Sequence, residues 1–92
     1  MTVRIHTNLV GVTQNDFDAV HKLVMAGDPP KGLIFHSSGP TESGWSVIDF
    51  WESRRDYDAG LGRVQEAIAA SGVKMQGPPE VEEFPVYETF QP

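Results

Sequence analysis

Two polar side chains, His36 and Asp49, stand among apolar neighbours, and together they could carry out acid–base chemistry. His36 follows the apolar run Leu-Ile-Phe, and Asp49 lies within the run WSVIDFW. An imidazole titrates near neutral pH and can pass protons. A carboxylate in apolar surroundings needs a partner, for which His36, Arg4 or a hydroxyl would serve. The two types predict a catalytic pair, with His36 as base or hydrogen-bond donor and Asp49 orienting it; the alternative is a core histidine with a satisfied hydrogen bond.

Aromatic residues around this pair could form the walls of a binding site. Trp45 and Trp51 alternate with Val47 and Asp49, so a strand would place all four on one face. Two indoles on one face could stack a flat ligand, or they could fill a core or a dimer interface. A glycine in the helix that follows would leave a gap beside a tyrosine. The predicted substrate-binding residues are Trp45, Trp51, Tyr57 and Gly60.

The elements that must position these residues follow the order β-α-β-β-α-β. Alternating or β-branched stretches predict strands at residues 2–10, 32–38, 45–52 and 80–90. Thr13 and Ser53 are N-cap residues that predict the starts of two helices with apolar stripes, and Gly72 is a suitable C-terminal stop. Pro85 predicts an edge position or a bulge for the last strand.

The pairing of the second and third strands decides whether the candidate site exists. In a register where even positions face odd ones, His36, Asp49 and both tryptophans share one face of the sheet. A slip of one residue would separate them. The sequence leaves this register open.

Length and charge restrict the classes of partner. Residues 1–92 form one α+β domain, too short to build a large core, and a partner subunit is the natural supplement because cysteine is absent. A net charge of −6 argues against nucleic acid and anionic membranes as partners. No apolar stretch is as long as the core of a signal peptide or as a membrane span, so a cytoplasmic location is expected. His6 and His21 show no metal-ligand spacing, and neither a metal nor another cofactor is expected.

Four stretches carry a resemblance to a known group of proteins. GLIFHSSGP, GWSVIDFWES, RRDYD and PPEVEEFPVYE resemble small uncharacterised bacterial proteins of the dimeric α+β barrel superfamily, which includes antibiotic biosynthesis monooxygenase-like domains. The resemblance covers nearly the whole chain. It implies a ferredoxin-like subunit with two helices on one face of an antiparallel sheet, and a homodimer whose two sheets pack face to face.

Two departures from that group bear on function. Relatives often carry a His-Asn pair near the end of the last strand, where this chain has Pro85 to Glu88, so the role of that histidine is lost or passes to Tyr87. Relatives also tend to have a bulky residue at the position of Gly60.

Two functions compete on this basis. The resemblance implies a cofactor-independent monooxygenase-like enzyme that acts on a small organic molecule in a cleft between helices and sheet. The lost His-Asn pair favours the alternative, a non-catalytic dimeric module that binds a small ligand or another protein. A cleft with His36 beside a carboxylate would favour the enzyme, and a fully packed layer would favour the module.

Overall fold

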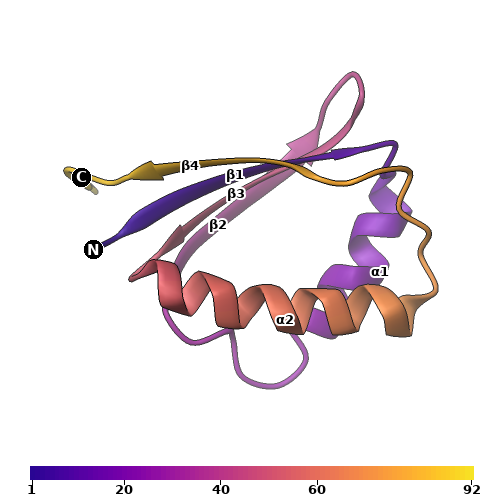
Figure 1. The fold of residues 1–92 in the computed structure, drawn as a ribbon, viewed down its shortest axis with the longest axis horizontal. Helices are drawn as coiled ribbons and strands as arrows, with labels where there is room; N and C mark the ends of the chain where they lie inside the picture. Colours follow the sequence, from indigo (N-terminus) through magenta and orange to yellow (C-terminus); the bar gives the residue numbers. More distant parts are fainter.

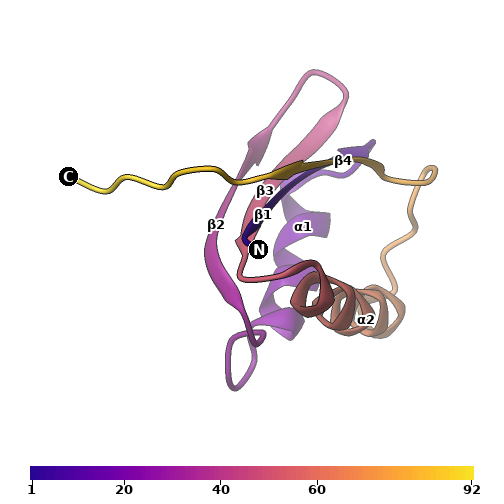
Figure 2. The same ribbon diagram turned by 60° about the vertical axis from the view of Figure 1, so that its left-hand side comes forward.

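The computed structural model describes residues 1–92, and its elements follow the predicted β-α-β-β-α-β order (Figure 1). Strands β1 (Val3–Val10), β2 (Leu33–Pro40), β3 (Gly44–Trp51) and β4 (Glu80–Pro85) form one antiparallel sheet in the order β2-β3-β1-β4. Helices α1 (Gln14–Val24) and α2 (Arg54–Ser71) lie together on one side of it (Figures 1 and 2). The predicted ferredoxin-like α+β fold is therefore confirmed.

Both helices begin at the predicted caps. The Thr13 hydroxyl accepts a hydrogen bond from the Asp16 amide, and the Asp16 carboxylate accepts one from the Thr13 amide, which forms a capping box. The Ser53 hydroxyl accepts from the Asp56 amide at the start of α2. Gly72 ends α2 with φ +77°, a left-handed conformation that favours glycine. Neither helix is long and apolar enough to cross a membrane.

The last strand is shorter than the predicted 80–90. It pairs only with β1, and Pro85 lies opposite Val3, the first residue of that strand. Beyond this point the Val86 amide donates one hydrogen bond to the Thr2 carbonyl at 3.0 Å. With no further partner strand, residues 87–92 extend away from the sheet as an arm (Figure 2). The edge position that Pro85 predicted is confirmed.

A β-bulge interrupts the pairing of β2 with β3. Leu33 lies opposite Trp51, but Phe35 lies opposite Phe50, so Ile34 is an extra residue with no counterpart. After the bulge each residue of β2 again has one partner on β3. Even-numbered residues of β2 now lie opposite odd-numbered residues of β3, and His36 lies opposite Asp49. The strand thereby directs both Leu33 and His36 to the helix side, although the two are three residues apart.

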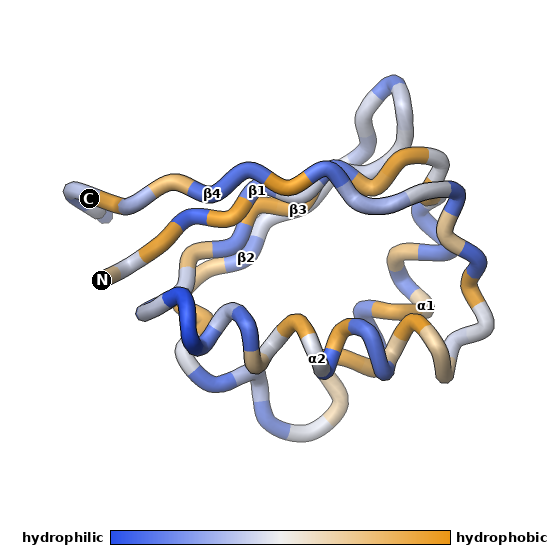
Figure 3. The backbone as a smooth tube through the Cα atoms, in the orientation of Figure 1, coloured by the Kyte–Doolittle hydropathy of each residue, from blue (hydrophilic) through white to orange (hydrophobic).

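The core lies where the sheet meets the first turns of α2. Val3, Ile5 and Trp51 form its centre, and Leu33 and Tyr57 pack against them. Apolar and polar residues alternate along β1, as Figure 3 shows, so one face of that strand supplies the core.

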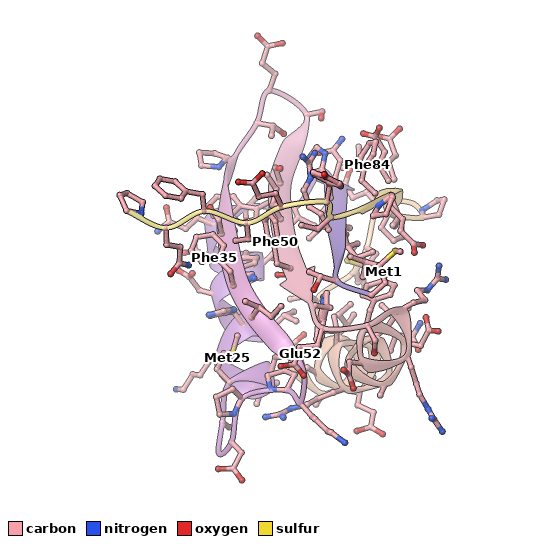
Figure 4. The ribbon with its side chains drawn as sticks, turned by 90° about the vertical axis from the view of Figure 1, so that its left-hand side faces the viewer. Met1, Met25, Phe35, Phe50, Glu52 and Phe84 are labelled. Atoms are coloured by element: carbon pink, nitrogen blue, oxygen red, sulfur yellow. The ribbon has the colours of Figure 1, made fainter.

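The opposite face of the sheet carries no helix and is divided into two ends. Only nine of the 92 residues are buried, which reflects this uncovered face. Phe35 contacts Phe50 edge-on, with ring centroids 6.1 Å apart, and Phe84 lies at the same end of the sheet (Figure 4). The other end is polar, since Asn8 pairs there with Ser46 and with Glu80. We call these the apolar end and the polar end of the open face.

Candidate functional site

His36 and Asp49 meet on the helix side of the sheet. Nδ1 of His36 lies 2.6 Å from Oδ1 of Asp49, and both side chains are largely buried, with 22% and 19% of their surfaces exposed. A carboxylate only accepts hydrogen bonds, so Nδ1 carries the proton and donates it to Asp49. The register that the sequence left open is the one that brings the pair together.

The second ring nitrogen of His36 is free. Nε2 is shielded from solvent and has no hydrogen-bond partner. In a neutral imidazole whose Nδ1 donates to a carboxylate, Nε2 keeps its lone pair. A buried acceptor of this kind costs free energy unless something donates to it. The arrangement is therefore that of a general base held in one tautomer by Asp49.

A stack of aromatic rings holds His36 from the side of α1. His21 lies over His36 with ring centroids 5.1 Å apart, and Phe17 stacks against both. Burial lowers the pKa of His21, and the neighbouring His36 lowers it further, whereas Asp18 and Asp49 oppose the shift. His21 thus favours its neutral form beside the pair.

His36 and Asp49 both line a cavity of about 300 Å³ between the sheet and the helices. This volume is at the lower end of the range for small-molecule pockets. Sixteen of its 26 lining residues are hydrophobic. A mainly apolar cavity with a few convergent polar groups suits a small organic molecule better than an ion.

Trp51 and Tyr57 form an aromatic corner of this cavity. Their rings meet edge-on at 6.1 Å, and Trp51 is 4% exposed. Burial raises the pKa of Tyr57, although the Arg54 guanidinium over its ring opposes the shift. Gly60 lines the cavity directly beneath the Trp51 indole, where a Cβ atom would lie 2.5 Å from Cη2. Glycine is needed here because the ring occupies the space of a side chain.

The structure brings five of the six predicted site residues to one cavity. His36, Asp49, Trp51, Tyr57 and Gly60 all line it. Trp45 shares their face of the sheet but lies outside the lining, where it stacks on Phe17 at 5.2 Å.

Two further observations concern the sequence-based expectations. Tyr87, the residue that could have taken over the role of the relatives' histidine, is fully exposed on the C-terminal arm. No group of three or more His, Cys, Asp or Glu side chains is arranged to hold a metal ion.

The sequence did not indicate that His21 and Phe17 lie beside His36. Both belong to the apolar stripe of α1 at a spacing of four residues, which places them on the same helix face. That spacing was the available signal. It could not be used because nothing in the sequence says which part of the sheet α1 covers.

Comparison with known proteins gives structural matches alone. No protein-family model matches the chain, and no curated protein is significantly similar to it in sequence. A monooxygenase of Streptomyces coelicolor, solved in complex with nanaomycin D, is 18% identical with a TM-score of 0.57 over 99% of this chain and 91% of its own. The cofactor-independent oxygenase SnoaB of Streptomyces nogalater is 15% identical with a TM-score of 0.63 over 96% and 94%.

A third match has no known activity. It is a dimeric ferredoxin-like protein of unknown function from Thermobifida fusca, 16% identical with a TM-score of 0.65 over 94% of this chain and 92% of its own. Identities this low show a shared fold. The chain therefore has the ferredoxin-like fold found both in antibiotic biosynthesis monooxygenase-like proteins and in dimeric proteins of unknown function.

Proposed function

We propose that the chain is a cofactor-independent monooxygenase-like enzyme that acts on a small, electron-rich organic molecule in the cavity between sheet and helices. The observation that carries this proposal is the free, shielded Nε2 of His36 beside an apolar cavity, with Nδ1 fixed by Asp49. Two structural neighbours of the same fold are described as a monooxygenase and a cofactor-independent oxygenase, which supports the reaction class.

The proposed chemistry begins with removal of a proton. Nε2 of His36 takes a proton from an acidic C–H or O–H of the substrate, and the Asp49 carboxylate stabilises the imidazolium that forms. The electron-rich carbanion, or the ring carbon of a phenolate, then reduces O₂ and binds it as a peroxide, which takes back the proton from Nε2 of His36 to become a hydroperoxide. Loss of water leaves a carbonyl, so that a CH₂ group, which in a phenol is the CH₂ of its keto tautomer, and O₂ become C=O and H₂O. The substrate supplies all the electrons that O₂ accepts.

The aromatic corner provides orientation. A flat substrate can stack on Trp51, whose ring lies close to α2 because residue 60 is a glycine. Tyr57 keeps its phenol proton because burial raises its pKa, so it can donate a hydrogen bond to a developing oxyanion.

The experiment is oxygen consumption with defined probes: an anthrone, a naphthohydroquinone and a simple phenol. We expect uptake with at least one of them, and His36→Gln should slow it by about 10²–10⁴-fold, the range of general base catalysis. Asp49→Asn should also slow it, because the wrong tautomer is then allowed. Lys22→Gln, on the exposed side of α1, is the control and should match the wild type.

Two outcomes would count against catalysis. Unchanged uptake in His36→Gln would remove the base from the mechanism. Quenching of tryptophan fluorescence by the probes without oxygen uptake would support the non-catalytic ligand-binding module instead.

We also propose that the chain forms a homodimer through the open face of its sheet. Phe35 and Phe84 expose 51% and 42% of their surfaces at the apolar end of this face, beside Phe50. A cluster of half-exposed aromatic residues is typical of an interaction surface. The neighbour from Thermobifida fusca is described as dimeric, which supports a dimer.

A further inference from the structure

One hydroxyl on the sheet side of the cavity has no partner. Eight residues of the sheet line the cavity between sheet and helices, and three of them are polar: Thr7, His36 and Asp49. His36 and Asp49 bond to each other. The Thr7 hydroxyl makes no hydrogen bond within the chain. It is the polar group on this floor that the fold leaves unused.

The surroundings of Thr7 are apolar. Ile5 and Leu9 flank it on the helix side of β1, and Val47 and Val81 pair with it from the two neighbouring strands. A valine has nearly the same shape and would complete this apolar floor, whereas an unpaired hydroxyl in such surroundings lowers stability. A ligand that bonds to the hydroxyl would remove this penalty.

We propose that Thr7 is the specificity-determining residue of the cavity, and that its hydroxyl binds an oxygen of the substrate remote from the reacting atom. The inference rests on the function proposed above, because it takes His36 as the group beside which the substrate reacts. A hydroxyl both donates and accepts, so it suits either a hydroxyl or a carbonyl of the ligand. The cavity lies on the helix side, so a dimer through the open face leaves Thr7 accessible.

The sheet sets the distance between Thr7 and His36. His36 lies opposite Asp49 on β3, which in turn lies opposite Ile5 on β1. Thr7 is two residues further along β1. Two strand spacings and two residues place the backbones of Thr7 and His36 about 12 Å apart. A contact of about 3 Å at each end leaves about 6 Å between the oxygen of the substrate and its reacting atom.

This spacing defines the class of substrate. A single benzene ring is shorter than the remaining distance, whereas two fused rings span it when the oxygen is on the ring remote from the reacting atom. The reacting ring then lies beside His36 and Trp51, and the second ring extends along the cavity floor to Thr7. The cavity volume of about 300 Å³ accommodates a molecule of this size.

The test uses two probes that differ only in the remote oxygen, 2,6-dihydroxynaphthalene and 2-naphthol. Isothermal titration calorimetry under argon measures both dissociation constants without oxidation. The ratio of the two constants should favour the diol more in the wild-type chain than in Thr7→Val, by about 2–12-fold, the range for one neutral hydrogen bond. Thr7→Ser keeps the hydroxyl and should keep the ratio. Thr89→Val, on the exposed C-terminal arm, is the matched control.

A second measurement needs no ligand. Urea denaturation of the free chains should give a higher midpoint for Thr7→Val, because valine removes an unpaired hydroxyl from an apolar surface and both residue types favour strands. A lowered midpoint would show that the hydroxyl is already satisfied in the free chain, and would overturn the proposal.

The outcomes separate this inference from the proposed oxidation. An unchanged ratio in Thr7→Val overturns the role of Thr7 and leaves the oxidation unaffected. A changed ratio without oxygen uptake supports Thr7 as a binding residue and counts against catalysis. If neither probe binds the wild-type chain, both the Thr7 site and the proposed use of the cavity for small aromatic molecules fail.

Discussion

The six-membered ring of the Trp51 indole occupies the space that a side chain at Gly60 would need. A Cβ atom at position 60 would lie 2.5 Å from Cη2, 3.1 Å from Cζ3 and 3.2 Å from Cζ2. Trp51 is part of the core and cannot swing away without disturbing Val3 and Ile5. The contact therefore fixes the distance between α2 and the sheet at the edge of the cavity.

Gly60→Ala should consequently destabilise the chain, although alanine is the better helix former. We expect a loss of about 1–3 kcal/mol from overpacking. Gly62→Ala is the matched control two residues on, because nothing lies within 4 Å of its Cβ position. That variant should gain about 0.5–1 kcal/mol. Urea denaturation measures both, and a stabilised Gly60→Ala chain would contradict the packing described.

The hydrogen bond between His36 and Asp49 should be detectable as an energetic coupling. A double-mutant cycle of His36→Gln and Asp49→Asn isolates the pairwise term, for which we expect about 1.5–3 kcal/mol at pH 7, the range for hydrogen bonds to charged groups. Denaturant midpoints of the four chains provide the measurement. A coupling below about 0.3 kcal/mol, the scatter of independent sites, would mean that the two side chains do not interact.

Acidification should destabilise the chain through His21. Burial and His36 hold the pKa of His21 below its ordinary value, so the unfolded chain binds this proton more tightly than the folded one. The stability that neutral His21 contributes is complete above its ordinary pKa of about 6.5 and is lost as pH falls through the lowered pKa of the folded chain. His21→Gln should show a smaller loss between pH 7 and pH 5. Equal losses in both chains would remove His21 from this effect.

The phenol of Tyr57 should ionise at a higher pH than an ordinary tyrosine. Burial raises its pKa above the ordinary value of about 10, because the phenolate is disfavoured beside Trp51. In the Tyr87→Phe chain Tyr57 is the one tyrosine, so absorbance at 295 nm reports it alone. We expect a midpoint above 10, with stability lost as pH rises through it. A midpoint at or below 10 would show that the ring is solvated.

The dimer should sediment at about twice the 10.1 kDa of one chain at micromolar concentration. Phe50→Glu should weaken it, because a charge at the apolar end of the open face opposes burial. Leu23→Glu is the control, since Leu23 is 42% exposed but lies on α1, on the other side of the sheet. A wild-type species of 10 kDa, or an undisturbed dimer in Phe50→Glu, would contradict the proposed interface.

Local signals in the sequence were sufficient to predict the fold. Thr13, Ser53 and Gly72 mark helix ends through chemistry that acts within one turn, and the structure uses all three. The last strand ended early because its length depends on β1, a partner more than 70 residues away in the sequence that begins only at Val3. The end of a strand that is set by a distant partner strand cannot be predicted from the local sequence.

The predicted site depended on the register of β2 against β3, which the periodicity of the sequence cannot reveal. Leu33, Ile34 and Phe35 are all apolar, so no alternation shows which of them points to the core. The register of His36 with Asp49 was therefore one of two equal options. The position of His21 beside His36 could not be predicted for a similar reason, because it results from the packing of α1 over β2 and not from the neighbours of His21 in sequence.

The bulge at Ile34 also affects how this strand is compared with others. Because Ile34 has no counterpart on β3, removing it would restore a regular ladder in which Leu33 still faces Trp51 and His36 still faces Asp49. A homologous strand one residue shorter can thus keep the same pair. An alignment with such a strand needs a gap at Ile34, and without that gap every residue on one side of it is assigned to the wrong face of the sheet.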